Sequence, residues 1–416
     1  MPEPTKLQAQ VSGEDAALIE IGIHNSPFAK RGHYALSDFA LQEKKNEHPS
    51  NAINSGQEFS FEIDKEGTVI SKLSLHYTAP ALTGLVTGAP TYARYSNFGA
   101  LQNLSVDQPI RYSYGASKVL EVHPDQIFSE YCLLENEHKR NVENLLKGEL
   151  TQAQRNTLAL QQQEFVVPLP TPWDGEGNEL PIAGLSNKIK ITFRFAPAAQ
   201  AIQTDGVKPL TITYTGVYLR YVLGHVSGAE RQQLIAPTLT DDGVFTLISE
   251  TTKIDKPAIV NSLNTANALG LGFDMNDFTG PIRQIRGLIR TQAQMDISLA
   301  SPAFYDIDTS YLNQLFFQAR ANDKSLFEIT RPNVEQLLQL DDQYECEGAI
   351  RQFRIWWDYK PTMENCASGH ITLANFANPR VYLRMPVAHP DLLITFLAKR
   401  WNWTNMSVGT YQSIWK

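Results

Sequence analysis

Apolar and polar positions alternate most clearly in two stretches of the chain, Phe165–Pro197 and Phe353–Pro386. Each stretch ends in a run of alternating residues before a proline, with apolar positions at Ile189, Ile191, Phe193 and Phe195 in the first run and Val381, Leu383 and Met385 in the second. A period of two is typical of a half-buried antiparallel strand. In the first run the opposite face carries Lys188, Lys190, Thr192 and Arg194, which we expect outside the core. The pattern predicts one structural element used twice.

An offset of 212 residues extends this correspondence to the beginning of each half. Without a gap it aligns Phe61 with Phe273, Ile63 with Met275, Asp64 with Asn276, Ile70 with Ile282 and Leu73 with Ile285. Each half then passes through short strand patterns, a helical insertion, an aromatic strand and the alternating strand, in that order. Solenoids repeat at roughly 20–50 residues, so a repeat of this length indicates a duplicated domain.

Each half contains about eight strand patterns separated by turn residues, with helices confined to long loops. Parallel βαβ folds would place a helix between most strands, which this chain does not do. We therefore predict an all-β fold of two tandem eight-stranded antiparallel jelly-roll sandwiches, a double jelly roll with short helices in its loops. The predicted division is an N-terminal arm over 1–55, a first jelly roll over 56–228 and a second over 229–416.

Helical patterns occur in the insertions and near the N-terminus. Between Glu130 and Gln163 the chain is rich in helix formers and predicts one or two helices. The matching insertion of the second half is expected at Thr309–Ala321 and Pro332–Leu340. In the N-terminal segment, Glu14–Ile21 and Leu36–Lys45 are predicted as short helices. The rest of that segment has no sustained periodicity, and we expect it to become ordered against a partner.

The order of these motifs resembles a known family. The succession FSFEID, VISKLSLHYTAPAL, a helical excursion, VPLP–PW–LPIAGL–KIKITFRF and TITYTGVYLRYVL is similar to the first barrel of double jelly-roll major capsid proteins. These proteins form the shells of tailless, membrane-containing bacteriophages, tectivirus-like and related, and of large eukaryotic DNA viruses. GPIRQIRGLIRTQ and NPRVYLRMP resemble the second barrel. The resemblance covers about Glu58 to Lys416.

This resemblance implies a structural protein of the virion, made in the host cytoplasm. Three chains would form a homotrimer of pseudo-hexagonal shape that tiles an icosahedral shell, over an internal viral membrane. The implied partners are neighbouring capsomers and, through the N-terminal arm, minor capsid or penton proteins and that membrane. The family has no catalytic residue. A β-sandwich spike protein that binds a receptor or carbohydrate is the alternative, and would have an aromatic-lined groove in one half only.

Composition excludes several other classes. The formal net charge is −8 without a dense basic run, which gives no support for nucleic-acid binding. Cys132, Cys346 and Cys366 lack the CxxC spacing of zinc sites and are expected as free thiols. The chain does not open on an apolar signal segment, and its apolar runs are shorter than the roughly 20 residues that span a bilayer, so we expect it to be made soluble inside a cell.

Candidate chemistry is equally sparse. No two of the nine histidines form the closely spaced pair of cupin-type metal centres, and HExxH, GxSxG and P-loop motifs do not occur. GLGFDM is expected to be a turn before a strand, and the Asp241–Asp242 and Asp341–Asp342 pairs to be solvated loops. We therefore predict no catalytic, cofactor-binding or metal-binding residue, and no enzyme. Five tryptophans near the C-terminus are predicted to pack in the core, with subunit contact as the second interpretation: Trp356, Trp357, Trp401, Trp403 and Trp415.

Overall fold

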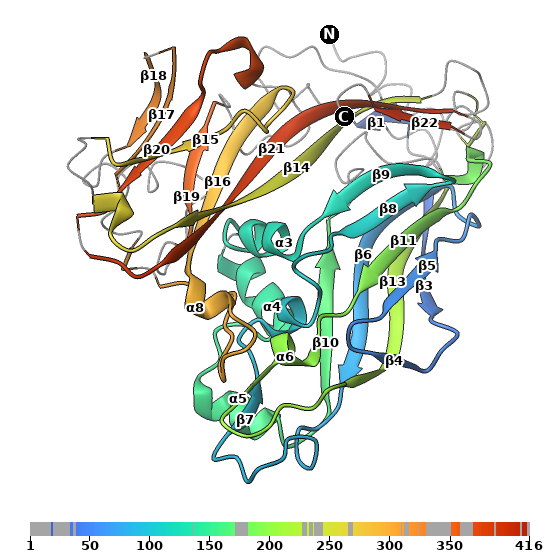
Figure 1. Ribbon diagram of the computed structural model, residues 1–416. Helices are drawn as coiled ribbons and strands as arrows, with labels where there is room; N and C mark the ends of the chain where they lie inside the picture. Colours follow the sequence, from blue (N-terminus) through green and yellow to red (C-terminus); the bar gives the residue numbers. More distant parts are fainter. Residues whose placement is uncertain are drawn as a thin grey trace.

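Antiparallel strands gathered in two groups make up most of the structure (Figure 1). The computed structural model describes residues 18–19, 34–35, 39–134, 136–170, 182–226, 231–232, 236, 244–264, 269–308, 310–311, 316–322, 324–329, 351–357, 369–386, 388–407 and 410–413. One group is formed by strands from the first half of the chain and the other by strands from the second half.

The first group consists of two facing sheets. One has the order β10 (Gln163–Leu169), β6 (Val69–Ala79), β13 (Thr213–Val226) and β3 (Phe39–Glu47), with β4 (Ala52–Asn54) also paired to β13. The other has the order β5 (Glu58–Glu62), β11 (Ile189–Arg194), β8 (Ile110–Tyr114) and β9 (Ser117–Val122). A short pair, β7 (Ala93–Tyr95) and β12 (Ile202–Thr204), lies at one end, and β1 (Leu18–Ile19) pairs with β2 (Tyr34–Ala35).

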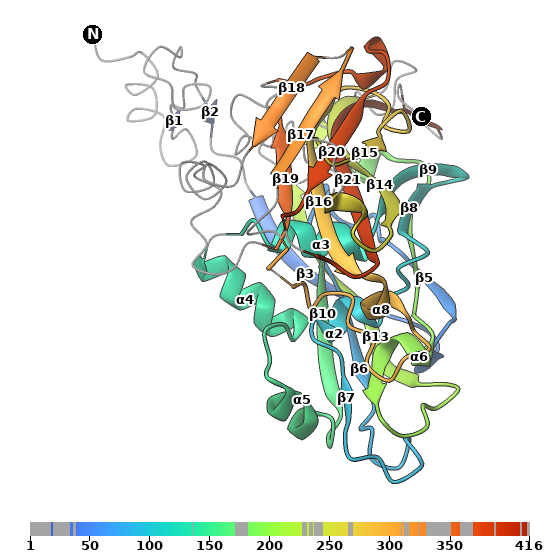
Figure 2. The same cartoon turned by 60° about the vertical axis from the view of Figure 1, so that its left-hand side comes forward.

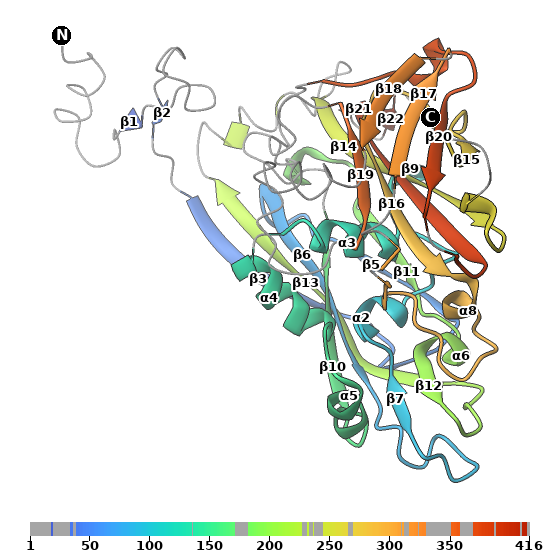
Figure 3. The same ribbon diagram turned by 90° about the vertical axis from the view of Figure 1, so that its left-hand side faces the viewer.

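The second group repeats this arrangement (Figure 3). Its larger sheet has the order β14 (Val244–Ala258), β21 (Leu392–Ser407), β16 (Ile282–Thr291) and β19 (Phe353–Trp356), with β22 (Thr410–Ser413) also paired to β21. Its smaller sheet has the order β15 (Leu271–Asp274), β20 (Arg380–Arg384), β17 (Phe316–Ala321) and β18 (Lys324–Ile329).

Strand order identifies both groups as jelly rolls. With β3 and β4 counted as one interrupted first strand, each half places its first, eighth, third and sixth strands side by side in one sheet. Its second, seventh, fourth and fifth strands form the other sheet. The predicted fold of two tandem eight-stranded jelly rolls is confirmed, and we call the two units the first and second barrel.

The offset of 212 residues found in the sequence also relates β6 to β16, and the strands paired with these two occupy matching rows at other offsets. In the first barrel, Tyr218 of β13 lies between His76 of β6 and Glu47 of β3. In the second barrel, Thr395 of β21 lies between Leu288 of β16 and Asp255 of β14. The adjacent row matches as well, with Ser74, Arg220 and Lys45 at the positions of Arg286, Leu397 and Lys253. The duplication therefore preserves side-chain positions as well as topology.

Period-two burial explains why these segments form strands. In β11, Ile189, Ile191 and Phe193 are buried while Lys190 and Arg194 are exposed, as the alternation predicts. Phe193 stacks on Phe59 of β5 with ring centroids 5.4 Å apart. Such aromatic pairs in the space between two sheets add to the apolar area removed from water.

Helices α4 (Asn136–Leu146) and α5 (Gln152–Leu158) confirm the one or two helices predicted between Glu130 and Gln163. A further helix of the same insertion, α3 (Pro124–Tyr131), begins before that range. The described remainder has short helices in loops: α2 (Gly99–Gln102), α6 (Ala198–Ala201) and α8 (Gln292–Met295), with 3₁₀ turns at Ile182–Gly184, Ser262–Asn264 and Leu373–Asn375.

Two helix predictions were wrong. Leu36–Lys45 contributes to strand β3, which pairs with β13, and Thr309–Ala321 contains strand β17, which pairs with β20. In β3 the residues from Ala40 to Glu47 are exposed or half-buried. This strand therefore lacks the alternation of apolar and polar residues, and its many helix-forming residues led to the wrong prediction. Because β3 and β4 belong to the first barrel's sheet, the predicted arm over 1–55 is too long at its C-terminal end.

Several predictions fall outside the described residues. Of Glu14–Ile21 only Leu18–Ile19 is described, and it forms a strand. The predictions outside the described residues concern Pro332–Leu340, Trp415, Cys346, Cys366 and both aspartate pairs. Cys132 is buried and forms no disulfide within the described residues, and GLGFDM is a turn at Gly270 (φ +80°) that enters β15.

Candidate functional site: the buried junction between the barrels

Helix α3 lies between the two barrels in all three views (Figures 1 to 3). Pro124 occupies its first turn, where a missing backbone N–H costs nothing, and Asp125 in the same turn complements the positive end of the helix dipole. From Pro124 to Ser129 every residue is buried. An eight-residue helix buried this fully must receive its contacts from elsewhere in the fold.

Asp125 supplies the central ionic contact. Its Oδ1 accepts a hydrogen bond from Arg290 Nη1 of β16 at 2.8 Å, and its Oδ2 lies 2.6 Å from Lys253 Nζ of β14. Arg290 also donates to Thr395 Oγ1, and that hydroxyl donates to Asp255 Oδ1 at 2.5 Å. One carboxylate of the first barrel thus binds two cations of the second.

The pKa of Asp125 is set by these contacts. Burial alone would raise the pKa of the carboxyl, because a charge is poorly solvated inside a protein. The positive charges of Arg290 and Lys253 and their hydrogen bonds outweigh burial and hold the pKa of Asp125 well below its usual range. Asp125 therefore stays ionised in the folded protein at neutral pH.

One turn later, α3 makes a second polar contact with the same sheet. Ser129 Oγ donates to Gln352 Oε1 at 2.6 Å, and Gln352 Nε2 donates back to the carbonyl of Ser129 at 3.1 Å. Arg286 Nη1 donates to Ser129 Oγ at 3.3 Å. Glu130 lies 3.9 Å from Lys399. Buried polar groups that are paired in this way avoid the cost of desolvation without a partner.

A loop of the second barrel also contacts the first barrel. The segment from Gln292 to Asp308 leaves β16 and reaches the first barrel beside α6 (Figure 1). The carbonyl of Pro302 accepts hydrogen bonds from Ser96 Oγ, Gln102 Nε2 and Gln203 Nε2 at 2.8–3.0 Å. Gln102 Oε1 accepts from the backbone N–H of Phe304 at 3.2 Å.

Apolar residues join the two barrels into one continuous core. Leu288, Phe304, Tyr305 and Leu397 from the second half belong to the same contiguous cluster as the first barrel's interior. Tyr305 lies against Phe128 of α3 with ring centroids 5.0 Å apart. The junction therefore fixes the orientation of one barrel relative to the other through hydrophobic packing and buried ion pairs together.

The sequence did not predict this junction. Asp125, Arg290 and Ser129 were not singled out. A signal was present in GPIRQIRGLIR, where Arg283, Arg286 and Arg290 interrupt an apolar strand; all three are buried in β16. Buried arginines require partners, so such a strand indicates an interface.

The tryptophans predicted to pack in the core differ in how deeply they are buried. Trp401 is buried at 4% exposure with the guanidinium of Arg283 4.0 Å from its ring centre, which confirms core packing there. Trp356 and Trp357 are half-buried against the second core. Subunit contact by their exposed parts stays a prediction. Trp403 is a residue of strand β21.

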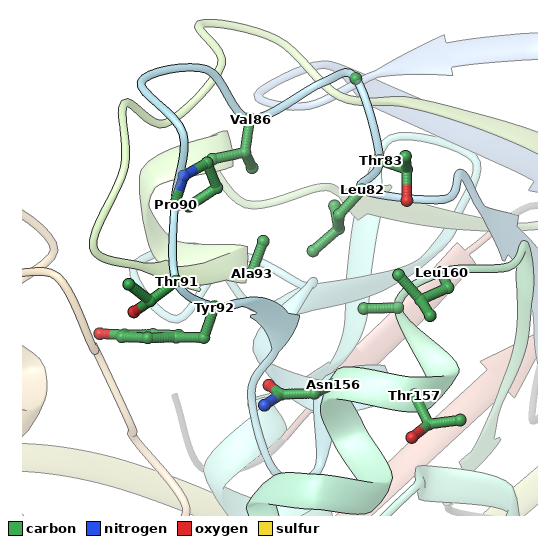
Figure 4. A pocket seen from close by; sticks show the side chains of 12 residues that line it. Leu82, Thr83, Val86, Pro90, Thr91, Tyr92, Ala93, Asn156, Thr157 and Leu160 are labelled. Atoms are coloured by element: carbon green, nitrogen blue, oxygen red, sulfur yellow. The ribbon is translucent and has the colours of Figure 1, made fainter.

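Within the described residues, no group of three or more His, Cys, Asp or Glu side chains is arranged to hold a metal ion. In the same part of the chain, no helix is long and apolar enough to cross a bilayer. A pocket of about 450 Å³ lies between the segment from Leu82 to Ala93 and the end of α5 (Figure 4). Its lining contains a single aromatic residue, Tyr92, alongside small and aliphatic ones such as Val86 and Leu160.

One family model matches the first barrel. Residues 28–224 match the family model described as "Major capsid protein N-terminus". This range spans strands β3 to β13 apart from the last residues of β13, which is nearly all of the first barrel. The first barrel therefore matches the major capsid proteins in sequence, and the chain as a whole has the double jelly-roll fold. No curated protein matches it by sequence.

Solved structures of capsids share the fold over nearly the whole chain. The quasi-atomic PBCV-1 virus capsid is 14% identical with a TM-score of 0.69, covering 93% of this chain and 99% of that one. The Faustovirus major capsid protein is 9% identical with a TM-score of 0.68, covering 97% of both chains. A Sputnik virophage chain is 9% identical with a TM-score of 0.51, covering 95% and 93%.

The match to this family has direct consequences. A major capsid protein is a structural component of the virion that assembles with neighbouring subunits into capsomers, and its family is not an enzyme family. The functional site of this capsid protein is therefore a set of contact surfaces. The interbarrel junction is the first of them.

Proposed function

We propose that three copies of this capsid protein form a pseudo-hexagonal homotrimer that tiles an icosahedral shell. The observation that carries this proposal is the pair of barrels with the same strand order and register, held together by a buried junction. Three such chains around a threefold axis present six similar barrels. A closed ring of identical contacts is the usual form of a soluble homo-oligomer.

Light scattering on the purified protein tests the trimer. We expect one species of three chains over a wide concentration range, because obligate interfaces commonly bury roughly 2,000–5,000 Å² or more. Electron microscopy of the same material should show particles with a six-lobed outline. A stable monomer at high concentration would contradict the proposal.

The remaining parts of the proposal concern the shell's surroundings. We propose that the shell encloses an internal membrane, and that the N-terminal arm contacts a neighbouring capsomer, a minor capsid or penton protein, or that membrane. Most residues before Phe39 lie outside the described part of the chain. The division of the barrels near residue 228 is likewise proposed, between the end of β13 at Val226 and the start of β14 at Val244.

Truncation tests the arm. Protein lacking the first 25 residues should still form trimers, since the described barrels begin at β3 (Phe39–Glu47). We expect it to fail at the next stage, assembly of trimers into shells. Normal shells from the truncated protein would remove the proposed role of the arm.

A receptor- or carbohydrate-binding spike is less well supported. Such a protein was expected to have an aromatic-lined groove, whereas Tyr92 is the one aromatic residue lining the pocket between Leu82 and Leu160 (Figure 4). The hydroxyl of Tyr92 also lies 2.9 Å from Ser301 Oγ, so part of its side chain is engaged within the fold. A glycan array that returned specific binding would revive the spike interpretation.

A further inference from the structure

Helix α3 begins at a histidine, at the point where the first barrel meets the second. His123 follows strand β9 directly and is the N-cap residue of α3, with an extended backbone (φ −89°, ψ 146°) and no capping hydrogen bond from its side chain. Its carbonyl accepts hydrogen bonds from the N–H groups of Gln126 and Ile127 at 2.9 and 3.3 Å. His123 therefore joins the first barrel's sheet to the helix that contacts the second barrel.

The imidazole ring of His123 suits the neutral form better than the protonated one. Its Nδ1 is buried, and among the described residues no group forms a hydrogen bond with that atom. One nitrogen of a neutral imidazole carries no proton, so Nδ1 can remain a bare acceptor. A protonated ring has an N–H on both nitrogens, and a buried N–H without an acceptor is costly.

The carboxylates around this ring are already paired with cations. The charged groups that act on His123 come from β14, α3 and β9, and are Lys253, Asp255, Asp125 and Glu121. Asp125 and Asp255 lie 2.6 and 3.3 Å from Lys253 Nζ. Glu121 lies 3.1 Å from the Nζ of Lys118. A proton on His123 would therefore add a cation beside Lys253 at a place where each nearby carboxylate already has a partner.

The start of a helix is also an unfavourable place for a cation, because the backbone N–H groups of the first turn give it a partial positive charge. Burial and the charge of Lys253 hold the pKa of His123 below its ordinary value of 6.5. The folded protein therefore takes up this proton less readily than the unfolded chain. The stability that neutral His123 contributes is complete above about pH 6.5 and is lost as the pH falls below that value.

We propose that His123 is an acid-sensitive switch of the junction between the barrels. When its ring is protonated, the new charge repels Lys253, the first turn of α3 moves away from β14, and Asp125 separates from Lys253 and Arg290. The junction is closed at neutral pH and opens more often in a mildly acidic compartment.

The rest of α3 would follow its first turn. The same helix carries Phe128, which packs against Tyr305, and Ser129, which is hydrogen-bonded to Gln352. Opening at His123 therefore loosens polar and apolar contacts between the barrels together. The switch acts within one chain, so it does not depend on the proposed trimer.

Hydrogen exchange in α3 tests the switch. Between about pH 7.5 and about pH 5, opening of the α3 amides in the wild-type protein should become about tenfold more frequent, after correction for the intrinsic effect of pH on exchange. Asp125 does not contribute in this interval, because its ordinary pKa is 3.8 and its pKa in the folded protein is lower. The response is therefore separate from any loosening of the junction in stronger acid.

A pair of matched substitutions assigns the response to one residue. His123→Asn keeps a favoured N-cap residue that does not titrate, so this variant should fold and its α3 exchange should change little over the same interval. His370→Asn replaces an exposed histidine of the second barrel and should keep the wild-type response. Equal α3 opening at the two pH values in the wild-type protein would overturn the inference. So would a response of wild-type size in His123→Asn, because the proton would then act elsewhere.

Discussion

Asp125 and Arg290 form a bidentate ion pair across the junction of the two barrels, with the shorter N–O distance at 2.8 Å. Their side chains are 0% and 1% exposed, although 165 residues separate them in the sequence. A pair so deeply buried is expensive to form and more expensive to break, because removing one partner leaves a charge without compensation. It therefore holds the barrels in one relative position.

Replacing the acid tests this role directly. Asp125→Asn should lower the free energy of unfolding by about 3–5 kcal/mol, since Arg290 and Lys253 would keep their charges in a buried site. Urea unfolding followed by tryptophan fluorescence gives the value. The control Asp64→Asn removes the partner of Lys188 at 3.4 Å in an exposed pair and should change stability by less than about 1 kcal/mol. Equal effects of the two substitutions would contradict the assigned role.

Acid should loosen the same junction. The pKa of Asp125 is lower in the folded protein than its ordinary value of 3.8, so the unfolded chain takes up the proton first as the pH falls. The stability from this group is therefore complete above that ordinary value and is lost as the pH drops below it. Thermal melting of wild type from about pH 5 down to about pH 2 should show this loss, and Asp125→Asn should show a shallower one. Parallel curves for the two proteins would refute the linkage.

One pair of facing core residues differs in size between the two barrels. In the second barrel Gly287 pairs with Phe353, whereas the equivalent pair in the first barrel is Leu75 with Val167. A Cβ at Gly287 would overlap the Phe353 ring, so Gly287→Ala should cost about 1–3 kcal/mol. Phe353→Val should be destabilising by leaving a cavity.

Combining the changes provides the check. The double variant Gly287→Leu/Phe353→Val copies the first barrel's pair and should recover part of the lost stability, which a double-mutant cycle would measure. Additive losses would show that the two positions do not share one space.

The position of the loop from Gln292 to Asp308 against the first barrel depends on Gln102. Its side chain donates to the carbonyls of Gln200 and Pro302 and accepts from the N–H of Phe304. Gln102→Leu should cost about 1–3 kcal/mol because these buried groups lose a partner. Hydrogen exchange should become faster in residues 300–306. Gln161→Leu, at an exposed position, is the control and should leave exchange there unchanged.

The strands of both barrels could largely be predicted because half-buried strands leave a period of two in the sequence. Ile189, Ile191 and Phe193 show this pattern and are buried as expected. Strand β3 lacks it, since its residues from Ala40 to Glu47 are exposed or half-buried, and helix propensity then misleads. The same local bias concealed β17, whose identity as a strand depends on pairing with β20.

The junction could not be predicted for a different reason. Its partners lie far apart in the chain, and neither Asp125 nor Ser129 stands in a motif. Only the three arginines of β16 carry a visible sign of burial, and a single sequence does not say which acid they meet. Long-range ion pairs are a property of the assembled fold and not of any local pattern.

The shared core has a consequence for how this protein is made. Phe98 and Phe128 of the first barrel belong to a cluster that is completed by Tyr305 and Leu397 of the second half. During translation the first barrel therefore emerges with part of its apolar interior still uncovered. Its final packing waits until Leu397 has left the ribosome, and over that interval the nascent chain is exposed to aggregation and to binding by chaperones.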